Sequence, residues 1–369
     1  MSRIGFDARL PAFHQGGIAT WIREVLNALQ SQNTAHHFTI FESRKARSSL
    51  AGRFRRSTLY TPCHHALEKY ALSVEFLPKG LDLLHSPDFI PPLRGARRHV
   101  ITIHDLHFLH YPQYMTRESR RYYCGQLGRA VRQADHILTV SHATQRDIMD
   151  LLQVPVERIT TQHHGVSHEF KPLSTALLDK QRRELKLPED FFLFVGTFEP
   201  RKNVVALLEA WRLLKEQLPD APPVVLAGRR GWLFDETLQR IEDLRIAEDI
   251  IWRENVPQES LPALYNLASA LVMPSMYEGF GLPALEAMAC GTLPIVSNVS
   301  SLPEVVGDVG ILVDPKDRDA LAAAMMRALT DSDWKAEQEA AGVNRAAGFT
   351  WENNVKVLVQ VWDQVLNDA

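Results

Sequence analysis

The fold is indicated first by residues 191–214, FFLFVGTFEPRKNVVALLEAWRLL. The run 191–195 is apolar throughout, which is typical of a strand buried on both faces of a parallel sheet. From Val204 to Leu218 the apolar residues recur at helical spacing, and Asn203 stands at the N-cap position. A buried strand, a polar loop and an amphipathic helix together predict one β/α unit of an α/β fold.

The same alternation of strand and helix runs through the rest of the chain. In the first half, short β-rich runs lie at 4–8, 38–41, 81–85, 99–104, 137–140 and 159–162. In the second half, further runs lie at 224–227, 250–252, 270–273, 294–297 and 311–313. The rhythm occurs twice, and a chain of 369 residues exceeds what one hydrophobic core usually holds. We therefore predict two Rossmann-like domains.

The predicted domain boundary lies within 169–188, where Pro172 and Pro188 bracket a polar helix. We expect an N-terminal domain over 1–170 and a C-terminal domain over 171–350. A last amphipathic helix is predicted from Trp351 to Leu366, within a final segment of 351–369.

The composition is that of a globular protein, with 45% hydrophobic and 23% charged residues, which excludes disordered, collagenous and coiled-coil classes. No run approaches the roughly 18 apolar residues of a spanning helix. Asp7 and Arg9 stand where a signal peptide needs its apolar core, so secretion is not expected. The widely spaced Cys63, Cys124 and Cys290 predict neither a disulfide framework nor structural zinc, and favour a reducing cytoplasm.

Charge is distributed unevenly along the chain. Residues 1–170 carry 21 Lys and Arg against 14 Asp and Glu (+7), and residues 171–369 carry 20 against 30 (−10), which sum to the net charge of −3. All 15 histidines also precede residue 171. Such halves indicate units that face different partners, with drift in surface composition as an equal alternative. No stripe of aromatic residues alternates with the basic ones, so nucleic-acid binding is not expected.

Ligands of parallel sheets bind beyond the carboxyl ends of the strands, so the residues after each strand are candidates. Gly16 and Gly17 precede the first predicted helix, where glycine lets backbone N–H groups approach an anion; an ordinary turn is the alternative. His104 and Asp105 stand at the end of the run 99–104. His104 could donate a hydrogen bond to a sugar hydroxyl or a developing charge, or be merely solvated, with Asp105 as a helix cap.

A metal site at the histidines that follow is not expected. His107 and His110 extend His104 to an H-x-x-H-x-x-H pattern. These positions drift around a helix axis, and no cysteine or fourth ligand is close in sequence, which argues against zinc.

The loop from Gly196 to Asn203 leads from the apolar strand into the helix. Arg201 offers a planar fork and Lys202 a compact charge, both suited to a diphosphate beside a helix N-terminus. We therefore expect a focus of positive charge here, with a solvated charge pair as the alternative.

A second loop, 278–286, reads EGFGLPALE. Pro283 is placed for the first turn of a helix, and Gly281 lets the preceding loop present backbone N–H groups. We expect Glu278 in the loop and Glu286 in the first helical turn, where both could accept hydrogen bonds from hydroxyl groups. Complementing the helix dipole is the alternative for Glu286.

Together these segments resemble the retaining glycosyltransferases of family 4, which have the GT-B fold of two Rossmann-like domains facing each other across a cleft. Glu278 and Glu286 match the E-x7-E element of that family, and Gly196–Asn203 matches its G-x-x-x-x-R-K-N segment. Gly16-Gly17, His104-Asp105 and the stretch from Ser300 to Pro315 match in order and spacing. The resemblance spans nearly the whole chain, and it implies that the last helix, within 351–369, crosses back to the first domain.

The resemblance implies a role for each candidate. Gly16 and Gly17 would approach the donor diphosphate, and Arg201 and Lys202 would neutralise it. Glu278 would hold sugar hydroxyls and Glu286 the nucleotide ribose. The remaining implied contacts are the backbone of Phe280, Gly281 and Leu282 with diphosphate and sugar, the backbone near Val256 with the base, and His104 with the transferred sugar.

The resemblance also implies a retaining transfer without a metal or other cofactor. The leaving phosphate oxygen would take the proton of the acceptor as the new bond forms on the same face of the sugar. Asp317-Arg318-Asp319 imitates a metal-binding D-x-D motif, but it stands at a predicted helix start, where acidic residues complement the dipole. No metal is therefore expected.

The expected partners are a nucleotide-sugar donor and a saccharide or polyprenyl-diphosphate-linked acceptor. Six cations and no acid lie between residues 44 and 56, and a basic helix is expected around Arg117–Arg132. This basic surface could lie against anionic lipid at the inner face of the membrane, so we expect a cytoplasmic protein with peripheral contact. A solvated loop is the alternative.

From overall likeness, the leading function is transfer of mannose from GDP-mannose in polysaccharide, lipopolysaccharide or O-antigen assembly. UDP-glucose is the rival donor. A non-catalytic nucleotide-sugar-binding protein would have lost Arg201, Lys202, Glu278 or Glu286, and all four are present. An NAD-dependent oxidoreductase would need the G-x-G-x-x-G fingerprint, which is missing.

Overall fold

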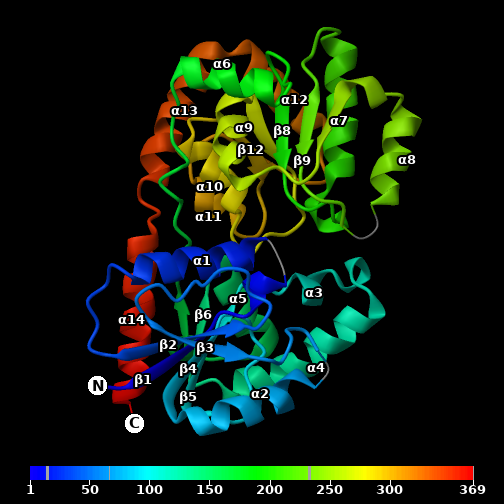
Figure 1. The fold of residues 1–369 in the computed structure, drawn as a ribbon. Helices are drawn as coiled ribbons and strands as arrows, with labels where there is room; N and C mark the ends of the chain where they lie inside the picture. The colour runs from blue at the N-terminus through cyan, green and yellow to red at the C-terminus, as the bar shows by residue number, and fades with distance from the viewer. Residues whose placement is uncertain (14–15, 66, 232–233, 369) are drawn as a thin grey trace. The chain divides into compact units, whose positions relative to one another are not determined.

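The computed structural model divides the chain into two α/β units and describes residues 1–13, 16–65, 67–231 and 234–368 (Figure 1). Unit 1 comprises Met1–Gly165 and Thr350–Ala369, and unit 2 comprises Val166–Phe349. The sequence set the boundary after 170. Residues 166–170 instead belong to unit 2, where the Val166 N–H donates to the Phe349 carbonyl and the Phe170 ring packs against Tyr265.

Unit 1 is built on a parallel sheet in the order β3-β2-β1-β4-β5-β6-β7. Its strands are β1 (Arg3–Asp7), β2 (His37–Ser43), β3 (Arg55–Leu59), β4 (Leu81–Ser86), β5 (Ala96–Ile103), β6 (His136–Thr139) and β7 (Ile159–Thr161). Its helices are α1 (Gly17–Leu29), α2 (Glu68–Phe76), α3 (His107–His110), α4 (Arg117–Gln133), α5 (His142–Leu152) and α14 (Trp351–Asn367).

Unit 2 is built on a second parallel sheet in the order β10-β9-β8-β11-β12-β13. Its strands are β8 (Phe192–Val195), β9 (Val224–Ala227), β10 (Ile250–Arg253), β11 (Ala270–Met273), β12 (Pro294–Ser297) and β13 (Ile311–Val313). Its helices are α6 (Thr175–Glu184), α7 (Val204–Gln217), α8 (Asp235–Leu244), α9 (Leu261–Leu267), α10 (Leu282–Ala289), α11 (Leu302–Val306), α12 (Arg318–Thr330) and α13 (Ser332–Ala346).

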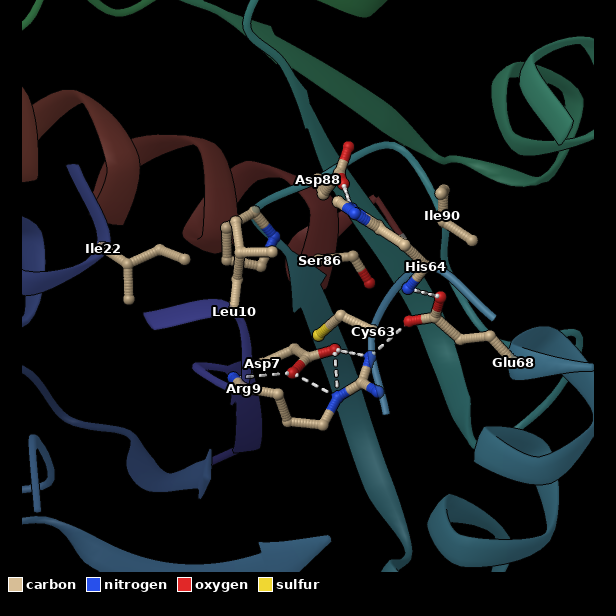
Figure 2. Close-up of a pocket in the computed structure, with 11 residues that line it drawn as sticks. Asp7, Arg9, Leu10, Ile22, Cys63, His64, Glu68, Ser86, Asp88 and Ile90 are labelled. Carbon is tan, nitrogen blue, oxygen red and sulfur yellow. Dashed lines mark hydrogen bonds and ion pairs between the residues drawn. The ribbon is translucent and has the colours of Figure 1, made fainter. Parts of the chain in front are cut away.

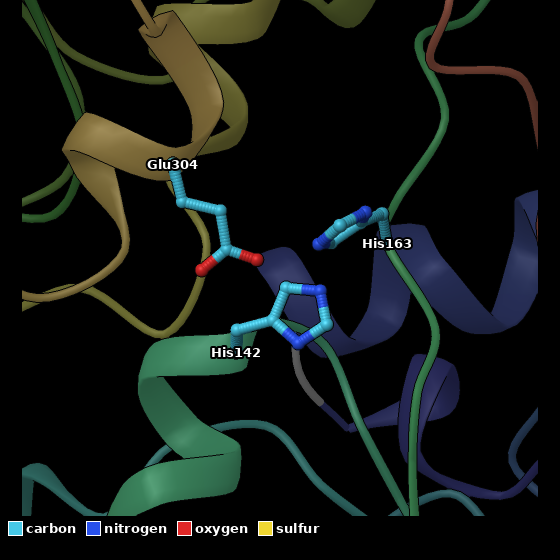
Figure 3. Close-up of side chains that lie close together, drawn as sticks. All are labelled: His142, His163 and Glu304. Atoms are coloured by element: carbon cyan, nitrogen blue, oxygen red, sulfur yellow. The ribbon is translucent and has the colours of Figure 1, made fainter.

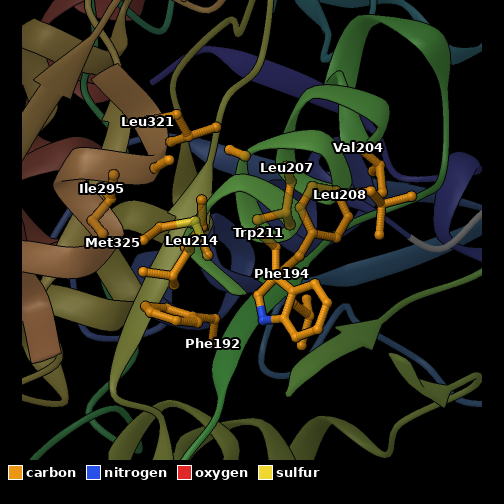
Figure 4. Packing of buried hydrophobic residues seen from close by; sticks show 14 of the residues in the cluster. Phe192, Phe194, Val204, Leu207, Leu208, Trp211, Leu214, Ile295, Leu321 and Met325 are labelled. Atoms are coloured by element: carbon orange, nitrogen blue, oxygen red, sulfur yellow. The ribbon is translucent and has the colours of Figure 1, made fainter. Parts of the chain in front are cut away.

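Each sheet separates two layers of helices because successive strand residues point to opposite faces. In β5, Val100 joins the cluster that contains residues of α1 and α14, whereas Ile101 joins the cluster that contains residues of α4. In unit 2, Phe192 and Phe194 pack against α7 around Trp211, as Figure 4 shows. Strands buried on both faces explain why the sequence shows continuous apolar runs.

The helix α14 packs into unit 1, the unit to which the N-terminal half of the chain also belongs. The Trp362 ring lies 6.4 Å from Phe6 of β1 and 5.4 Å from Phe38 of β2, measured between ring centroids. The family resemblance implied the same placement for this segment.

The twelve predicted strand runs all correspond to strands, and β3 was missed. The bounds of β9, β11, β12 and β13 are those predicted, whereas the ends of the other eight are shifted. Strand β3 pairs with β2 at the edge of the sheet, and its Arg55 and Arg56 are exposed. Asn203 does precede α7, but its side chain does not cap the helix. It has a φ of 55° and donates its amide to the carbonyls of Pro274 and Pro315 instead.

A search of the described helices for membrane spans found none that is long and apolar enough to cross a bilayer.

Candidate functional site

The best-formed candidate site of unit 2 lies where β8 and β11 end. These strands are neighbours, and the strand order of the sheet reverses between them. Such a reversal opens a crevice at the carboxyl edge of an α/β sheet, in which ligands bind. Gly196 follows β8, and Arg201 and Lys202 form the single turn Pro200–Lys202 just beyond. Glu278 lies in the loop after β11.

Glu278 forms ion pairs with both predicted cations. The Lys202 Nζ lies 2.6 Å from one carboxylate oxygen and the Arg201 Nη1 lies 3.1 Å from the other. The Arg201 Nε lies 3.0 Å from Glu199 Oε2, and its Nη1 also donates to the Tyr277 carbonyl. The side chains of Lys202 and Glu278 are 10% and 7% exposed, so both are held inside the unit rather than in bulk water.

The pKa values reflect this enclosure. Burial alone would raise the pKa of Glu278, but the charges of Lys202 and Arg201 outweigh it and hold the pKa below its usual value. Burial lowers the pKa of Lys202, with Arg201 adding to the effect and Glu278 opposing it. Two cations therefore face two carboxylates, Glu278 and Glu199. This balance corrects the expected focus of positive charge.

Two serine side chains, Ser300 and Ser301, hold the loop 278–281 by hydrogen bonds to its backbone. The Glu278 N–H donates to Ser300 Oγ at 2.9 Å, and Ser301 Oγ lies 2.8 Å from the carbonyls of Glu278 and Phe280. Gly281 precedes α10 with a φ of 104°, and a Cβ there would lie 2.6 Å from the Leu302 side chain. Glycine is therefore required at this helix start, where backbone N–H groups are unpaired within the helix. Leu282 is the first residue of α10.

Glu286 lies in the second turn of α10, not in the first turn as the sequence predicted. Its Oε2 accepts a hydrogen bond of 2.7 Å from the hydroxyl of the buried Tyr265. Burial raises the pKa of Tyr265, and the charge of Glu286 adds to it, so the phenol remains a donor. The other predicted position of this unit, Val256, lies half-buried after β10.

Asp317 is the N-cap of α12 rather than a residue of its first turn. Its Oδ1 accepts the Ala320 N–H at 2.9 Å. The sequence Asp317-Arg318-Asp319 is therefore the start of a helix, with Asp317 as its cap.

In unit 1, Gly16 and Gly17 open helix α1. Gly16 has a φ of 136° and is exposed, and its carbonyl accepts the Thr20 N–H. A Cβ on either glycine would meet no atom of the described residues within 4 Å. The space above this helix start is therefore open to a ligand.

His104 follows β5 and its ring is committed on one side. Nε2 lies 2.9 Å from the Pro87 carbonyl, and the ring packs against Trp21 with centroids 5.4 Å apart. Burial lowers the pKa of His104, so the ring is neutral at pH 7 and its single N–H donates to Pro87. Nδ1 is then an acceptor, which corrects the expectation that His104 donates to a sugar. Asp105 accepts hydrogen bonds from the backbone N–H and the ring Nδ1 of His107. The N-cap of α3 is Leu106, so Asp105 is not the helix cap of the alternative interpretation.

The histidines of the H-x-x-H-x-x-H pattern face different partners. His107 pairs with Asp105, whereas His110 Nε2 lies 2.9 Å from Asp147. Two other histidines of unit 1 do meet, because the His142 and His163 rings stand edge to face with centroids 5.3 Å apart (Figure 3). Glu304, also drawn there, belongs to α11 of unit 2.

Sequence reasoning missed Glu199, Tyr265 and Ser301. Glu199 stands within the quoted 196–203 loop, two residues before Arg201, so its charge was a usable signal. Tyr265 and Ser301 are 21 and 23 residues from their partners Glu286 and Glu278 in the sequence, so no local spacing indicated either contact.

Comparison with known proteins assigns both halves of the chain. Residues 15–170 match the family described as Glycosyltransferase Family 4, and residues 178–346 match Glycosyl transferases group 1. The chain is 39% identical over 272 residues to the O-antigen chain mannosyltransferase B of Escherichia coli, a match that covers 73% of this chain and 71% of that protein. It is 32% identical over 259 residues to the serotype-specific mannosyltransferase WbdA of Escherichia coli, covering 68% of this chain but only 31% of WbdA.

Among solved structures, the sucrose-phosphate synthase of Thermosynechococcus elongatus superposes with a TM-score of 0.80 at 23% identity, with 100% of both chains covered. That likeness shows a shared fold.

Proposed function

We propose that this chain transfers mannose from GDP-mannose to a saccharide acceptor with retention of configuration. The chain belongs to glycosyltransferase family 4 and is a hexosyltransferase of the GT-B fold. Both relatives from Escherichia coli are named mannosyltransferases, which supports the choice of sugar. One of them is named for the O-antigen chain, which supports a growing polysaccharide, free or linked to a polyprenyl diphosphate, as the acceptor.

One observation carries this proposal: Arg201, Lys202 and Glu278 meet at the point where the sheet order of unit 2 reverses. The two cations and the nearby N-terminus of α10 are the groups that a diphosphate needs. A carboxylate has about four lone-pair sites, so Glu278 can accept sugar hydroxyls while it keeps both cations. We assign the nucleotide ribose to Glu286, the base to the backbone near Val256, and the diphosphate also to Gly16 and Gly17.

In the proposed reaction the bond between the anomeric carbon and the phosphate oxygen breaks, and negative charge grows on the departing GDP. Arg201 and Lys202 stabilise that charge more strongly in the transition state than in the ground state, which lowers the barrier. The leaving phosphate oxygen takes the proton of the acceptor hydroxyl, and the new glycosidic bond forms on the same face. The neutral His104 accepts a hydrogen bond from the transferred sugar through Nδ1.

The donor is tested by incubating the purified chain and a saccharide acceptor with GDP-mannose or UDP-glucose and following the nucleoside diphosphate released and the glycoside formed. We expect turnover and a raised melting temperature with GDP-mannose, since a ligand that binds the folded state stabilises it. If UDP-glucose supports turnover and GDP-mannose does not, the donor is UDP-glucose and the transferred sugar is glucose. Activity should persist in excess chelator, because protein cations hold the diphosphate; loss of activity that magnesium restores would refute a metal-free site.

We also propose that unit 1 contacts an anionic membrane through α2 and its surroundings. Exposed apolar residues lie in this helix at Tyr70 (54% exposed) and Val74 (72%), and at its two ends at Leu67 (60%) and Leu77 (58%). Cations flank them, since Lys69 lies over the Tyr70 ring and Arg44 lies over that of the exposed Tyr60. Each cation near an anionic surface contributes about 1 kcal/mol, and the apolar side chains can insert between headgroups.

Flotation with vesicles of phosphatidylcholine and phosphatidylglycerol tests this contact. The double variant Tyr70→Ser, Val74→Ser should lose binding at low salt. The matched control Leu177→Ser, Leu238→Ser removes two exposed apolar residues of unit 2 and should float like the wild type. Failure of the wild type to float would dismiss the membrane contact.

A further inference from the structure

Unit 1 has a pocket of its own at the carboxyl edge of its sheet (Figure 2). Asp7 is the last residue of β1, and Ser86 is the last residue of β4, and both line the pocket. Strands β1 and β4 are neighbours, and the strand order of this sheet reverses between them. The pocket therefore stands at the place where the topology alone predicts a ligand.

One wall of the pocket is a closed ionic network around Arg9. The Arg9 side chain is 2% exposed and donates to Asp7 and Glu68, each at 2.8 Å, and to the Thr61 carbonyl at 2.9 Å. Glu68 also accepts the Tyr122 hydroxyl. Because each of the three guanidinium nitrogens donates to one of these partners, Arg9 forms the wall of the pocket.

The lining as a whole carries more negative than positive charge. Asp7, Glu68 and Asp88 supply three carboxylates. The groups that can carry positive charge are two, Arg9 and the protonated form of His64. His64 Nε2 lies 3.0 Å from Asp88 Oδ2, so this histidine is paired with the third carboxylate. Such a lining disfavours a phosphate or carboxylate ligand and offers acceptors to hydroxyl groups.

Ser86 gives the second indication of a ligand. The residue is 3% exposed, and its hydroxyl has no hydrogen-bond partner among the described residues. A buried hydroxyl without a partner costs stability, so such a group needs an explanation. Figure 2 shows Ser86 among the side chains that surround the pocket. A ligand hydroxyl would satisfy it.

The pocket also adjoins His104, the residue to which we assign the transferred sugar. Pro87 lines the pocket, and its carbonyl accepts the hydrogen bond from His104 Nε2. A group bound to Ser86 would therefore lie beside Pro87, the next residue in the chain, whose carbonyl orients the His104 ring.

The volume of the pocket, about 20 Å³, suits one small polar group. We propose that this pocket receives one hydroxyl group of a neutral sugar at the growing end of the acceptor, with Ser86 and Asp88 as its specificity-determining residues. This inference rests on the proposed mannosyl transfer, and it adds the chemical class of the acceptor: a hydroxyl-bearing sugar without a carboxylate or phosphate at its terminus.

Steady-state kinetics with GDP-mannose and octyl α-mannoside tests the role of Ser86. Ser86→Ala should raise the acceptor KM about three- to tenfold, the value of one hydrogen bond, and leave the donor KM unchanged. Its melting temperature should equal or exceed that of the wild type, because the deleted hydroxyl has no partner in the free protein. Thr139→Val is the matched control: Thr139 ends β6 with a buried, unpartnered hydroxyl outside the pocket, so the acceptor KM should not change.

The charge argument is tested with the corresponding octyl mannosiduronic acid. The wild type should use this anionic acceptor much less well than the neutral one, and Asp88→Asn should narrow the difference. Equal use of both acceptors by the wild type, or an acceptor KM for Ser86→Ala equal to that of the wild type, would overturn the proposal.

Direct binding separates this proposal from the proposed function. Saturation-transfer NMR of octyl α-mannoside reports acceptor binding whether or not GDP-mannose is consumed. A wild type that binds the probe but transfers no mannose would refute the donor assignment alone. A probe signal that is undiminished in Ser86→Ala and Asp88→Asn would refute the pocket alone.

Discussion

Glu278 is the residue whose environment differs most from its sequence-based interpretation. The sequence offered it to sugar hydroxyls and assigned Arg201 and Lys202 to phosphate as separate groups. In the structure one carboxylate bridges both cations inside the unit. Each charge is therefore stabilised by its ion pairs rather than by water, since a buried charge without a partner lowers the free energy of unfolding.

This coupling predicts the outcome of a double-mutant cycle. Lys202→Met and Glu278→Gln should each lower the free energy of unfolding by about 3–5 kcal/mol, because each leaves a buried charge without its partner. The combination should cost clearly less than the sum of the two. Urea denaturation measures all four proteins. Additive losses would show that the contact between Lys202 and Glu278 contributes no coupling.

At the scale of elements, β3 shows how an edge strand escapes a search for apolar runs. Only Leu59 of its five residues is buried, since the strand pairs on one side and faces solvent with most of its side chains. Its arginines also suit an edge, where charge discourages pairing with other chains. The central strands were all found because burial on both faces demands continuous apolar sequence.

The start of α1 allows a prediction about a whole element. Gly17 is not among the glycines with positive φ, and a Cβ there would meet nothing within 4 Å. Gly17→Ala should therefore raise the free energy of unfolding by about 0.4–1 kcal/mol, because it restricts the unfolded chain. If this helix start contacts the donor, the same variant should raise the KM for GDP-mannose.

Thermal denaturation and donor kinetics of Gly17→Ala measure the two effects separately. An unchanged donor KM in a stabilised variant would remove Gly17 from the donor site.

At the scale of the molecule, the uneven distribution of histidine acquires a structural meaning. Several histidines of unit 1 are buried within or beside its sheet. Burial lowers the pKa of His85 to about 3 and that of His99 to about 4, and it also lowers the pKa values of His104, His136 and His164. These rings fold in the neutral form.

The chain should therefore lose stability in mild acid. Between pH 6.5 and about 4 these histidines are protonated in the unfolded chain but remain neutral in the folded chain. The free energy of unfolding therefore falls as the pH falls. His85 and His99 should each contribute a loss of about 2 kcal/mol between pH 7 and pH 5. His64, whose pKa is raised because Asp88 outweighs its burial, should offset a part. Urea denaturation at the two pH values checks this, and equal stability would contradict it.

The amino-acid sequence alone predicted the fold class, the division into two domains to within a few residues, and the loops that carry the candidate site. It could do so because each of these depends on local periodicity, on helix-start chemistry, or on glycine and proline positions. Glu278, Arg201 and Lys202 were all named in this way, although their mutual contact was not.

The contacts between charged side chains, and the hydrogen bonds that occupy a ring such as that of His104, were visible only in the folded chain. Residues 76 and 77 positions apart in the sequence form the ion pairs of Glu278, and residues 17 apart fix the tautomer of His104. Such pairings follow from strand order, which places the ends of β8 and β11, or of β4 and β5, side by side. Strand order is set by the packing of whole elements, so no local stretch of sequence records it.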